Sequence, residues 1–288
     1  MRAIYRHELS SHFTGLTAYV FGAFVLLFAG LFTMIYNIDG GYAQFEYALA
    51  DMSLVFVIAI PILTMRVISE ERRQKTDQLL YSLPISMTGV IMGKYLALLT
   101  VLLIPTAVIA LYPVLLSAYG DLYLPAAMGA LFGFYLLGAA LLAMGMFISS
   151  LTESQAMAAG ICFVVMLMNY FIASLAAYVG TTAFTSYGAF AVALLLGVWA
   201  VYRMTKNKFI TLVTCTLTQC GLLLWYMLDT NGFRGAFPAL IEKLSLFSRF
   251  YTFINGVMDL RSVVYLLSVC VIFVYLSIQS MEKRRWSE

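Results

Sequence analysis

The residues best able to do chemistry stand together in one short stretch, residues 66–77 (RVISEERRQKTD). Seven charged residues fall within these twelve positions, although the whole chain of 288 residues has only 17 lysines and arginines and 14 acidic residues. Charges of both signs on a surface serve ion pairing and charge-assisted hydrogen bonding with another macromolecule. We therefore interpret this stretch as a contact surface for a soluble protein.

No pattern in the rest of the sequence predicts catalysis. Residues 89–94 (GVIMGK) faintly resemble a phosphate-binding loop, but the motif is one residue short, Tyr95 replaces the required Ser or Thr, and no strand precedes it. Lys94 is instead expected to extend from the end of an apolar helix to the membrane surface. His7 and His12 have no metal ligands at suitable spacing, and an ordinary interfacial role is expected for them. We predict a chain that is not an enzyme and has no ATP, cofactor or metal site of its own.

The composition is that of a membrane protein. The chain is 62% hydrophobic and 11% charged, with a mean hydropathy of +0.92, whereas soluble domains carry about 25% charged residues. Its apolar runs of about 20 residues are long enough to cross a bilayer, and only helices satisfy their backbone within one segment there. We predict an all-α polytopic protein with eight spans, at about 16–36, 49–67, 89–118, 124–149, 155–179, 184–202, 209–228 and 262–281. The cysteines all fall in apolar segments and are expected to be buried there, namely Cys162, Cys215, Cys220 and Cys270.

Lysine and arginine predict the orientation, because they are enriched in cytoplasmic loops. Thirteen lie in the loops on the side of the two termini, and four lie in the opposite loops. We therefore expect a multi-pass protein of the bacterial cytoplasmic membrane with both termini, the charged stretch and the loop at 203–208 in the cytoplasm. The net charge of +3 reflects this orientation, and no nucleic-acid partner is expected. The opposite loops carry the acids Asp39, Glu46, Asp51 and Asp121.

The charged stretch is predicted to form a cytoplasmic helix over residues 69–83, ended by Pro84. Ser69 is expected to cap the helix, and Glu70 and Glu71 lie in its first turn, where the helix dipole favours acids. Two ion pairs at i,i+4 spacing are expected, Glu71 with Lys75 and Arg73 with Asp77. One stripe of the helix is apolar, formed by Thr76, Leu79, Leu80 and Leu83. The residues alone leave two interpretations open, a docking helix and a solvated linker between two spans.

A second amphipathic segment, residues 237–254, is predicted on the outer side. Its pattern suits a helix lying in the membrane interface, and equally a surface helix packed on neighbouring spans. It indicates amphipathic or lipid-like cargo, or an extracytoplasmic auxiliary protein as a partner. Asn169 is a possible pathway-lining residue within the spans, although a hydrogen bond to a neighbouring helix is the favoured interpretation. The small residues in rows at Gly129/Gly133 and Ala156/Gly160 predict close helix packing.

Two separated motifs resemble one known family. Residues 68–85 (ISEERRQKTDQLLYSLPI), followed by Gly93 and Lys94 in the next span, are similar to permeases of type-2 ABC exporters and look most like their gliding-motility-type branch. Residues 246–265 (LFSRFYTFINGVMDLRSVVY) and 282–286 (EKRRW) resemble the same branch. The resemblance implies a six-helix ABC exporter core plus an extra pair, at about 184–228, that departs from the usual family pattern.

The resemblance implies that residues 1–288 form a single transmembrane permease domain. A separate cytoplasmic ATPase would bind ATP and Mg²⁺, and a second permease, identical or different, would complete a dimer in the lipid membrane. Residues 69–83 match the family's coupling helix, which docks in a cleft on the ATPase. Polar contacts are expected from Glu70, Glu71, Arg72 and Arg73, and anchoring contacts from Leu79, Leu80 and Leu83.

Two functions other than export are considered as alternatives. A membrane module that anchors a gliding-type complex, or transmits force in it, would move no solute. An ion-coupled carrier is disfavoured, because such carriers need ionisable groups at mid-membrane depth, and the spans hold few polar groups beyond Asn169 and Gln219.

Overall fold

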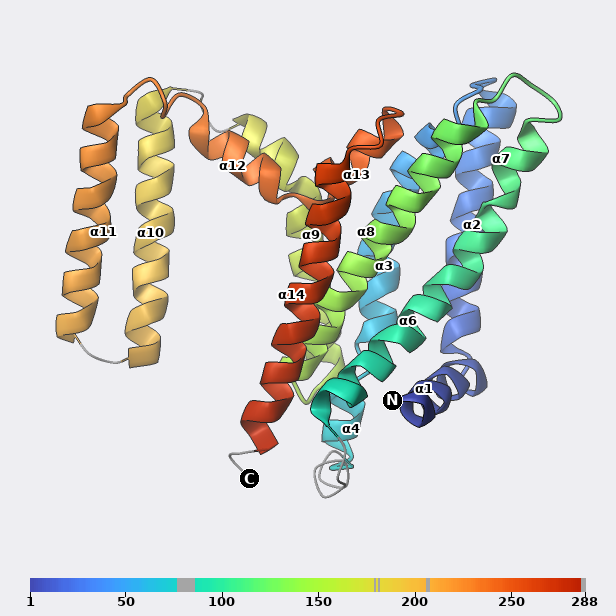
Figure 1. Cartoon of the computed structure of the whole chain (residues 1–288), viewed down its shortest axis with the longest axis horizontal. Coiled ribbons are helices and arrows are strands. Elements are labelled where there is room, and N and C mark those ends of the chain that lie inside the picture. The colour runs from blue at the N-terminus through green and yellow to red at the C-terminus, as the bar shows by residue number, and fades with distance from the viewer. Residues whose placement is uncertain (77–85, 179, 181, 206–207, 286–288) are drawn as a thin grey trace. The chain divides into compact units, whose positions relative to one another are not determined.

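The computed structural model describes residues 1–76, 86–178, 180, 182–205 and 208–285, and every regular element in these ranges is a helix (Figure 1). The predicted all-α class is confirmed. Within these ranges seven helices are long and apolar enough to cross a membrane. The contacts divide the chain into two compact units, unit 1 (Met1–Tyr170 and Leu246–Glu288) and unit 2 (Phe171–Ser245). The predicted extra pair of spans lies within unit 2.

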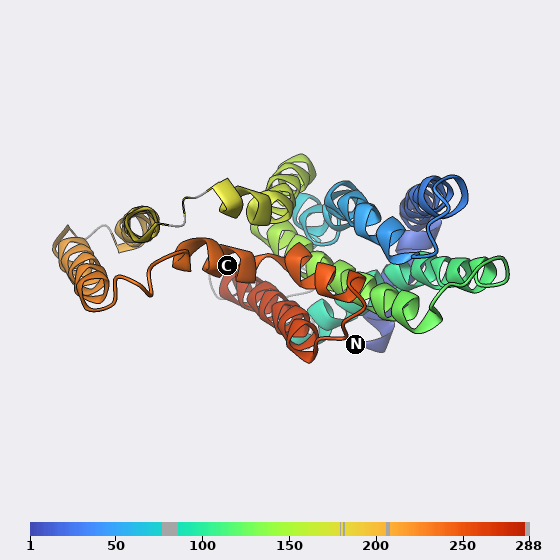
Figure 2. The same ribbon diagram turned by 90° about the horizontal axis from the view of Figure 1, so that it is seen from above.

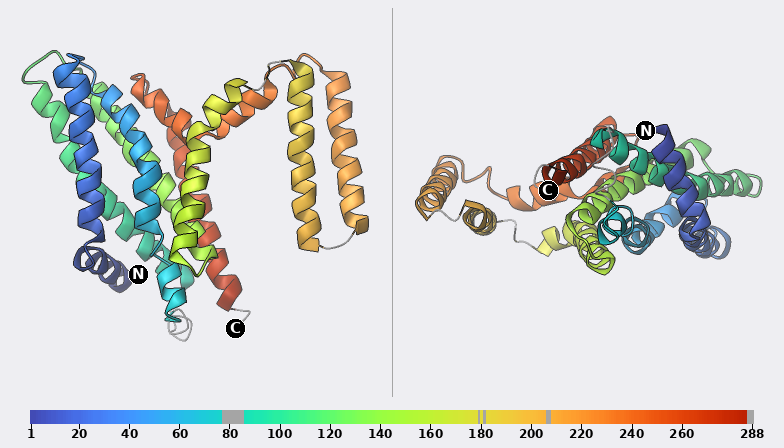
Figure 3. Two further views of the ribbon diagram at one scale, coloured as in Figure 1. Left: turned by 180° about the vertical axis from the view of Figure 1, so that it is seen from behind. Right: turned by 90° about the horizontal axis from the view of Figure 1, so that it is seen from below.

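Unit 1 contains most of the predicted spans and the N-terminal helix α1, which the sequence did not indicate. Its elements are α1 (Arg2–Thr14), α2 (Thr17–Thr33) with the π-helix η1 (Met34–Asp39), α3 (Glu46–Thr64), α4 (Ser69–Arg73), α6 (Met87–Ile109), α7 (Leu111–Leu116), α8 (Leu124–Leu151), most of α9 (Gln155–Tyr178), α13 (Leu246–Ile254) and α14 (Leu260–Arg285). Figures 1 and 3 show α1, α4 and both termini at one end of this unit. The α7–α8 loop and α13 lie at the other end.

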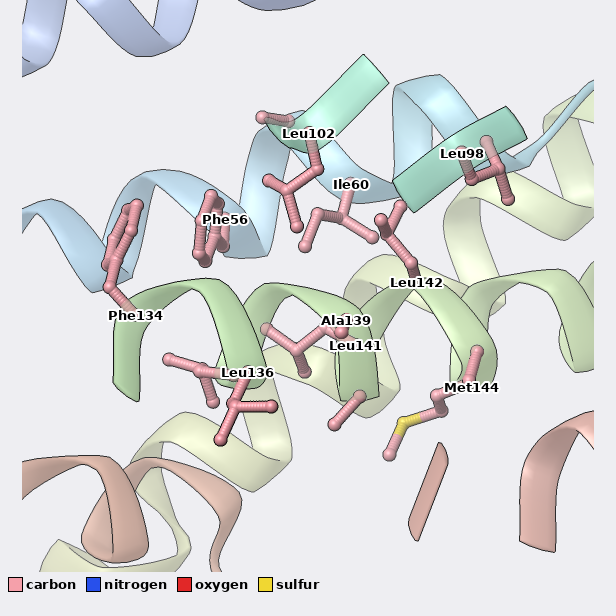
Figure 4. Close-up of a cluster of buried hydrophobic side chains, with 14 of the residues drawn as sticks. Phe56, Ile60, Leu98, Leu102, Phe134, Leu136, Ala139, Leu141, Leu142 and Met144 are labelled. Carbon is pink, nitrogen blue, oxygen red and sulfur yellow. The ribbon is translucent and has the colours of Figure 1, made fainter. Parts of the chain in front are cut away.

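Helix α8 forms the centre of unit 1. It packs against α3, α6, α13 and α14, as the view from above in Figure 2 also shows. Figure 4 shows the core between α3, α6 and α8, where Phe56 stacks on Phe134 with ring centroids 4.3 Å apart. Close approach depends on glycine, because a Cβ at Gly138 would lie 2.7 Å from a Leu102 methyl group and one at Gly133 would lie 2.6 Å from Phe253.

The third predicted span is interrupted near its second proline. The chain forms α6 up to Ile109, a turn at Ala110, and then α7. Pro113 has no amide hydrogen for the Ile109 carbonyl four residues earlier, which accounts for the break. Helix α6 continues through Pro105.

Unit 2 is a helical hairpin with a short third helix. Its antiparallel helices α10 (Ala183–Thr205) and α11 (Lys208–Leu228) contact each other, and α12 (Ala236–Leu244) packs on α10. Gln219 donates to the Ala191 carbonyl at 3.2 Å. Phe233 is buried among aromatic rings of α10 and α11, with Trp225 at 4.8 Å, Tyr226 at 5.5 Å and Phe190 at 6.0 Å between centroids. Cys220 is exposed in this unit and was wrongly expected to be buried, whereas Cys162 and Cys270 of unit 1 are buried.

The segment 237–254 is two helices, so the prediction of one continuous helix is wrong. Ser245 adopts an extended conformation between α12 and α13 and ends the first helix. In α13 the apolar side chains face the core of unit 1, where Phe247, Phe250 and Phe253 are buried against neighbouring helices including α3 and α8. For α13, packing on neighbouring spans is therefore the correct alternative.

Candidate coupling site

Helix α4 begins at Ser69, as predicted, but it ends at Arg73. Lys75 has a φ of 56°, and the amides of Lys75 and Thr76 donate back to the carbonyls of Arg72 and Glu71. This arrangement is a Schellman motif, which terminates a helix. A helix running without interruption from 69 to 83 is therefore wrong at residues 74–76. Residues 77–85, with Asp77, Leu79, Leu80, Leu83 and Pro84, lie outside the described residues.

The first turn of α4 is capped by another helix. Ser149 at the end of α8 accepts hydrogen bonds from the amides of Ile68 and Ser69, both at 3.2 Å, and its hydroxyl also donates to the Met65 carbonyl at 3.3 Å. Ser69 was expected to provide the cap, but its own hydroxyl donates back to the Met65 carbonyl. The start of α4 is thus fixed to the end of α8 through buried backbone groups.

Arg72 provides a second attachment to the same helix end. Its guanidinium donates to the Ser150 carbonyl at 2.6 Å and to the Thr152 carbonyl at 3.3 Å, and the residue is only 5% exposed. These carbonyls terminate α8, where a cation also complements the helix dipole. Arg72 therefore points into unit 1.

Lys94 joins three elements in the same region. Its ammonium group lies 2.6 Å from Glu8 Oε1 of α1 and 2.7 Å from Glu71 Oε1 of α4, and it donates to the Val67 carbonyl at 3.0 Å. The expectation that Lys94 reaches out to the membrane surface is wrong, because its side chain is 2% exposed. A buried ammonium requires such partners, and here they fill all three of its donor positions.

The predicted contact residues therefore divide into two groups. Glu71 and Arg72 bind other residues of unit 1. Arg73 and Lys75 are exposed, and Glu70 lies in a surface ion pair with Arg66 at 3.1 Å.

A cavity of about 740 Å³ opens between α1, the end of α3, α4 and α6, with Lys94 in its lining. His12 also lines it, and its ring nitrogen Nδ1 lies 3.2 Å from the Thr17 hydroxyl. Burial lowers the pKa of His12, Lys94 lowers it further, and Glu8 opposes both. The lowered pKa favours the neutral form of the imidazole. No group of three or more potential metal ligands occurs in the described parts of the chain.

Sequence reasoning missed the residues that hold α4 in place, namely Glu8, Lys94, Ser149 and Ser150. A signal was present for Lys94, because a lysine two turns inside an apolar span favours buried pairing. Ser149 and Ser150 gave none, since helices in membranes often contain serine. Asn169, the pathway candidate, accepts a hydrogen bond from the Leu246 amide at 3.1 Å and so caps α13.

The helices long and apolar enough to span a membrane describe a multi-pass membrane protein. The family model for the ABC-2 family transporter proteins matches residues 2–286, and the chain belongs to this family. It is therefore a permease component of an ABC transporter. Membership implies, in general terms, association with an ATPase subunit and dimerisation. No curated protein matches the chain.

Proposed function

We propose that this chain is the permease subunit of an ATP-driven exporter in the bacterial cytoplasmic membrane, with both termini in the cytoplasm. The segment 69–83 receives the movement of a separate ATPase, which binds ATP and Mg²⁺. The observation that carries the proposal is the attachment of α4 to three other helices, through Lys94 to α1 and α6 and through Ser149 and Arg72 to α8.

This attachment explains how a small surface helix moves a membrane domain. Helix α4 is too short to be stable by itself, because isolated helices of fewer than about 12 residues are marginal in water. Its position is fixed by buried polar bonds to α1, α6 and α8. A displacement of α4 must either break these bonds, which are costly to leave unmade in a buried site, or carry the attached helices along.

Within the described part of the segment, docking belongs to the exposed residues. Arg73 and Lys75 point away from the buried cluster, and they favour an acidic surface on the ATPase. Glu71 and Arg72 transmit movement inside the permease. Asp77, Leu79, Leu80 and Leu83 keep their predicted role as docking residues.

Charge reversal at the exposed positions tests docking. The double variant Arg73→Glu and Lys75→Glu should lose co-purification with the ATPase and lose stimulated ATP hydrolysis. Lys283→Glu is the matched control, because Lys283 is an exposed lysine near the C-terminus and outside the segment. Wild-type assembly and stimulation in the double variant would contradict the docking role.

The resemblance to the gliding-motility-type branch supports a second candidate, a force-transmitting or anchoring module. The two functions differ in their response to solute. An exporter reconstituted with its ATPase in liposomes should hydrolyse ATP faster when cargo is present. An anchor should assemble with the ATPase and show no response to any solute offered.

A further inference from the structure

A second cavity lies at the end of unit 1 opposite α4. It has a volume of about 470 Å³ and is formed by the start of α3, the loop before α8 and the end of α13. None of the contacts that hold α4 involves this region. Its volume falls in the range of small-molecule sites, which is about 300–1,000 Å³.

The described charged residues that line the cavity are all acidic. Glu46 and Asp121 line it, and no lysine, arginine or histidine is among its described lining residues. The nearby chain segments 37–51 and 117–126 also hold acids and no basic residue, and the third segment, 249–261, holds Arg249, Asp259 and Arg261 outside the lining. The field at this opening therefore favours a cation.

Glu46 is the lining residue that most strongly indicates a ligand. It lines the cavity and is only 6% exposed. Within the described residues its carboxylate has no partner from another residue, and only its own backbone amide lies close to it. Glu46 is thus a largely buried residue whose carboxylate faces the cavity without a described counter-charge, and a cation entering the cavity would supply one.

The rest of the lining indicates the type of cation. Tyr47 and Tyr123 add aromatic rings, and ammonium groups bind to the faces of such rings. A bare metal ion fits less well, since it would have only two carboxylates in a cavity of about 470 Å³. The apolar side chain of Ile254 borders the same space.

We propose that this cavity binds an organic cation, an ammonium group on an apolar body, with Glu46 as its counter-charge and Tyr47 and Tyr123 beside it. Resting on the proposed export function, the site would hold cationic cargo at the outer end of the permease.

Binding of benzyltrimethylammonium to the full-length permease in nanodiscs tests the site, with no ATPase present. Saturation-transfer NMR should detect the cation and give a much weaker signal for its neutral carbon analogue, neopentylbenzene, after subtraction of empty nanodiscs. Glu46→Gln should weaken binding about tenfold, equivalent to about 1.4 kcal/mol. Asp39→Asn is the matched control, an exposed outer acid that does not line the cavity, and it should change affinity less than about twofold.

Two exposed positions keep the test decisive if Glu46→Gln fails to fold. Tyr123 is 71% exposed and Asp121 is exposed, so Tyr123→Leu and Asp121→Asn should fold and should each weaken binding severalfold. Equal binding of the neutral analogue, or wild-type affinity in all the cavity variants, would overturn the proposal. Such a failure leaves the docking test at Arg73 and Lys75 unaffected, because that test measures assembly with the ATPase at the other end of the unit.

Discussion

Lys94 is the residue on which the attachment of α4 to α1 depends. Replacing it by methionine removes two ion pairs and leaves Glu8 and Glu71, whose side chains are only 17% and 24% exposed, without this cation. Removing one partner of a buried ion pair typically costs about 3–5 kcal/mol. We expect a lower melting temperature and faster hydrogen exchange in α1, measured by scanning fluorimetry and exchange mass spectrometry.

The reason for this loss can be tested by neutralising the acids as well. The triple variant Lys94→Met, Glu8→Gln and Glu71→Gln buries no uncompensated charge, and its stability should recover most of the loss. Lys283→Met, at an exposed position, should have little effect. If Lys94→Met melts as the wild type does, the three-way contact contributes nothing to the fold.

Variants at two adjacent serines distinguish a role in transmitting the movement of α4 from a role in ordinary helix packing. Ser149→Ala leaves the buried amides of Ile68 and Ser69 without their acceptor, which should cost about 1–3 kcal/mol and uncouple ATP hydrolysis from the permease while assembly persists. Ser150→Ala is the matched control, because that hydroxyl donates only to the Phe147 carbonyl of its own helix. The measurement compares ATPase stimulation with co-purification, and equal behaviour of the two variants would contradict the role of Ser149.

At the scale of elements, α8 depends on glycine where α13 crosses it. A Cβ at Gly133 would lie 2.6–2.9 Å from Cβ and the ring of Phe253, and the base of a side chain cannot move aside easily. Gly133→Ala should therefore destabilise unit 1 by about 1–3 kcal/mol. Gly129→Ala on the same helix meets Met258 at an ordinary 3.7 Å and should be neutral or stabilising. The measurement is the melting temperature of both variants. Equal melting temperatures would show that the contact between Gly133 and Phe253 is not tight.

The helices that were predicted correctly are those that the residues of the helix itself specify. Apolar length placed the spans, because the bilayer requires it regardless of what each helix contacts. The end of α4 was missed because lysine rarely adopts the left-handed conformation found at Lys75. The end of α12 was missed although Ser245 is of a residue type that often precedes a new helix. Helix α1 was also missed, because nothing in a polar N-terminal segment shows that Lys94 will bind it.

The position of the candidate site in the chain was predicted from the sequence, but the direction in which each of its side chains points was not. Seven charges in twelve positions mark a contact surface, yet no spacing rule tells which of them face a partner. Arg72 faces inward because the carbonyls at the end of α8 lie beside it, 78 residues away in the chain. Only the tertiary fold brings these groups together, and this is why the docking and transmitting residues could not be separated from the sequence.

At the scale of the whole molecule, the proposal requires that α4 and the two termini face the cytoplasm and the Glu46 cavity faces outward. Single cysteines in a variant lacking the four native cysteines test this. Tyr119, 92% exposed in the α7–α8 loop, should become accessible to a membrane-impermeant maleimide in intact cells when replaced by cysteine. Lys283→Cys should react only after permeabilisation, because lysine-rich and arginine-rich ends stay inside.

Thr230→Cys extends the same test to unit 2. Thr230 is exposed in the loop between α11 and α12, and it should label from outside if α10 and α11 both cross the membrane. An even number of crossings between Tyr119 and Thr230 would then agree with α10 and α11 both crossing, and it would exclude a single crossing within unit 2. Labelling of Lys283→Cys in intact cells would place α4 outside, away from ATP, and would refute the coupling mechanism as a whole. Labelling of Thr230→Cys only after permeabilisation would leave α4 in the cytoplasm and overturn only the span assignment in unit 2.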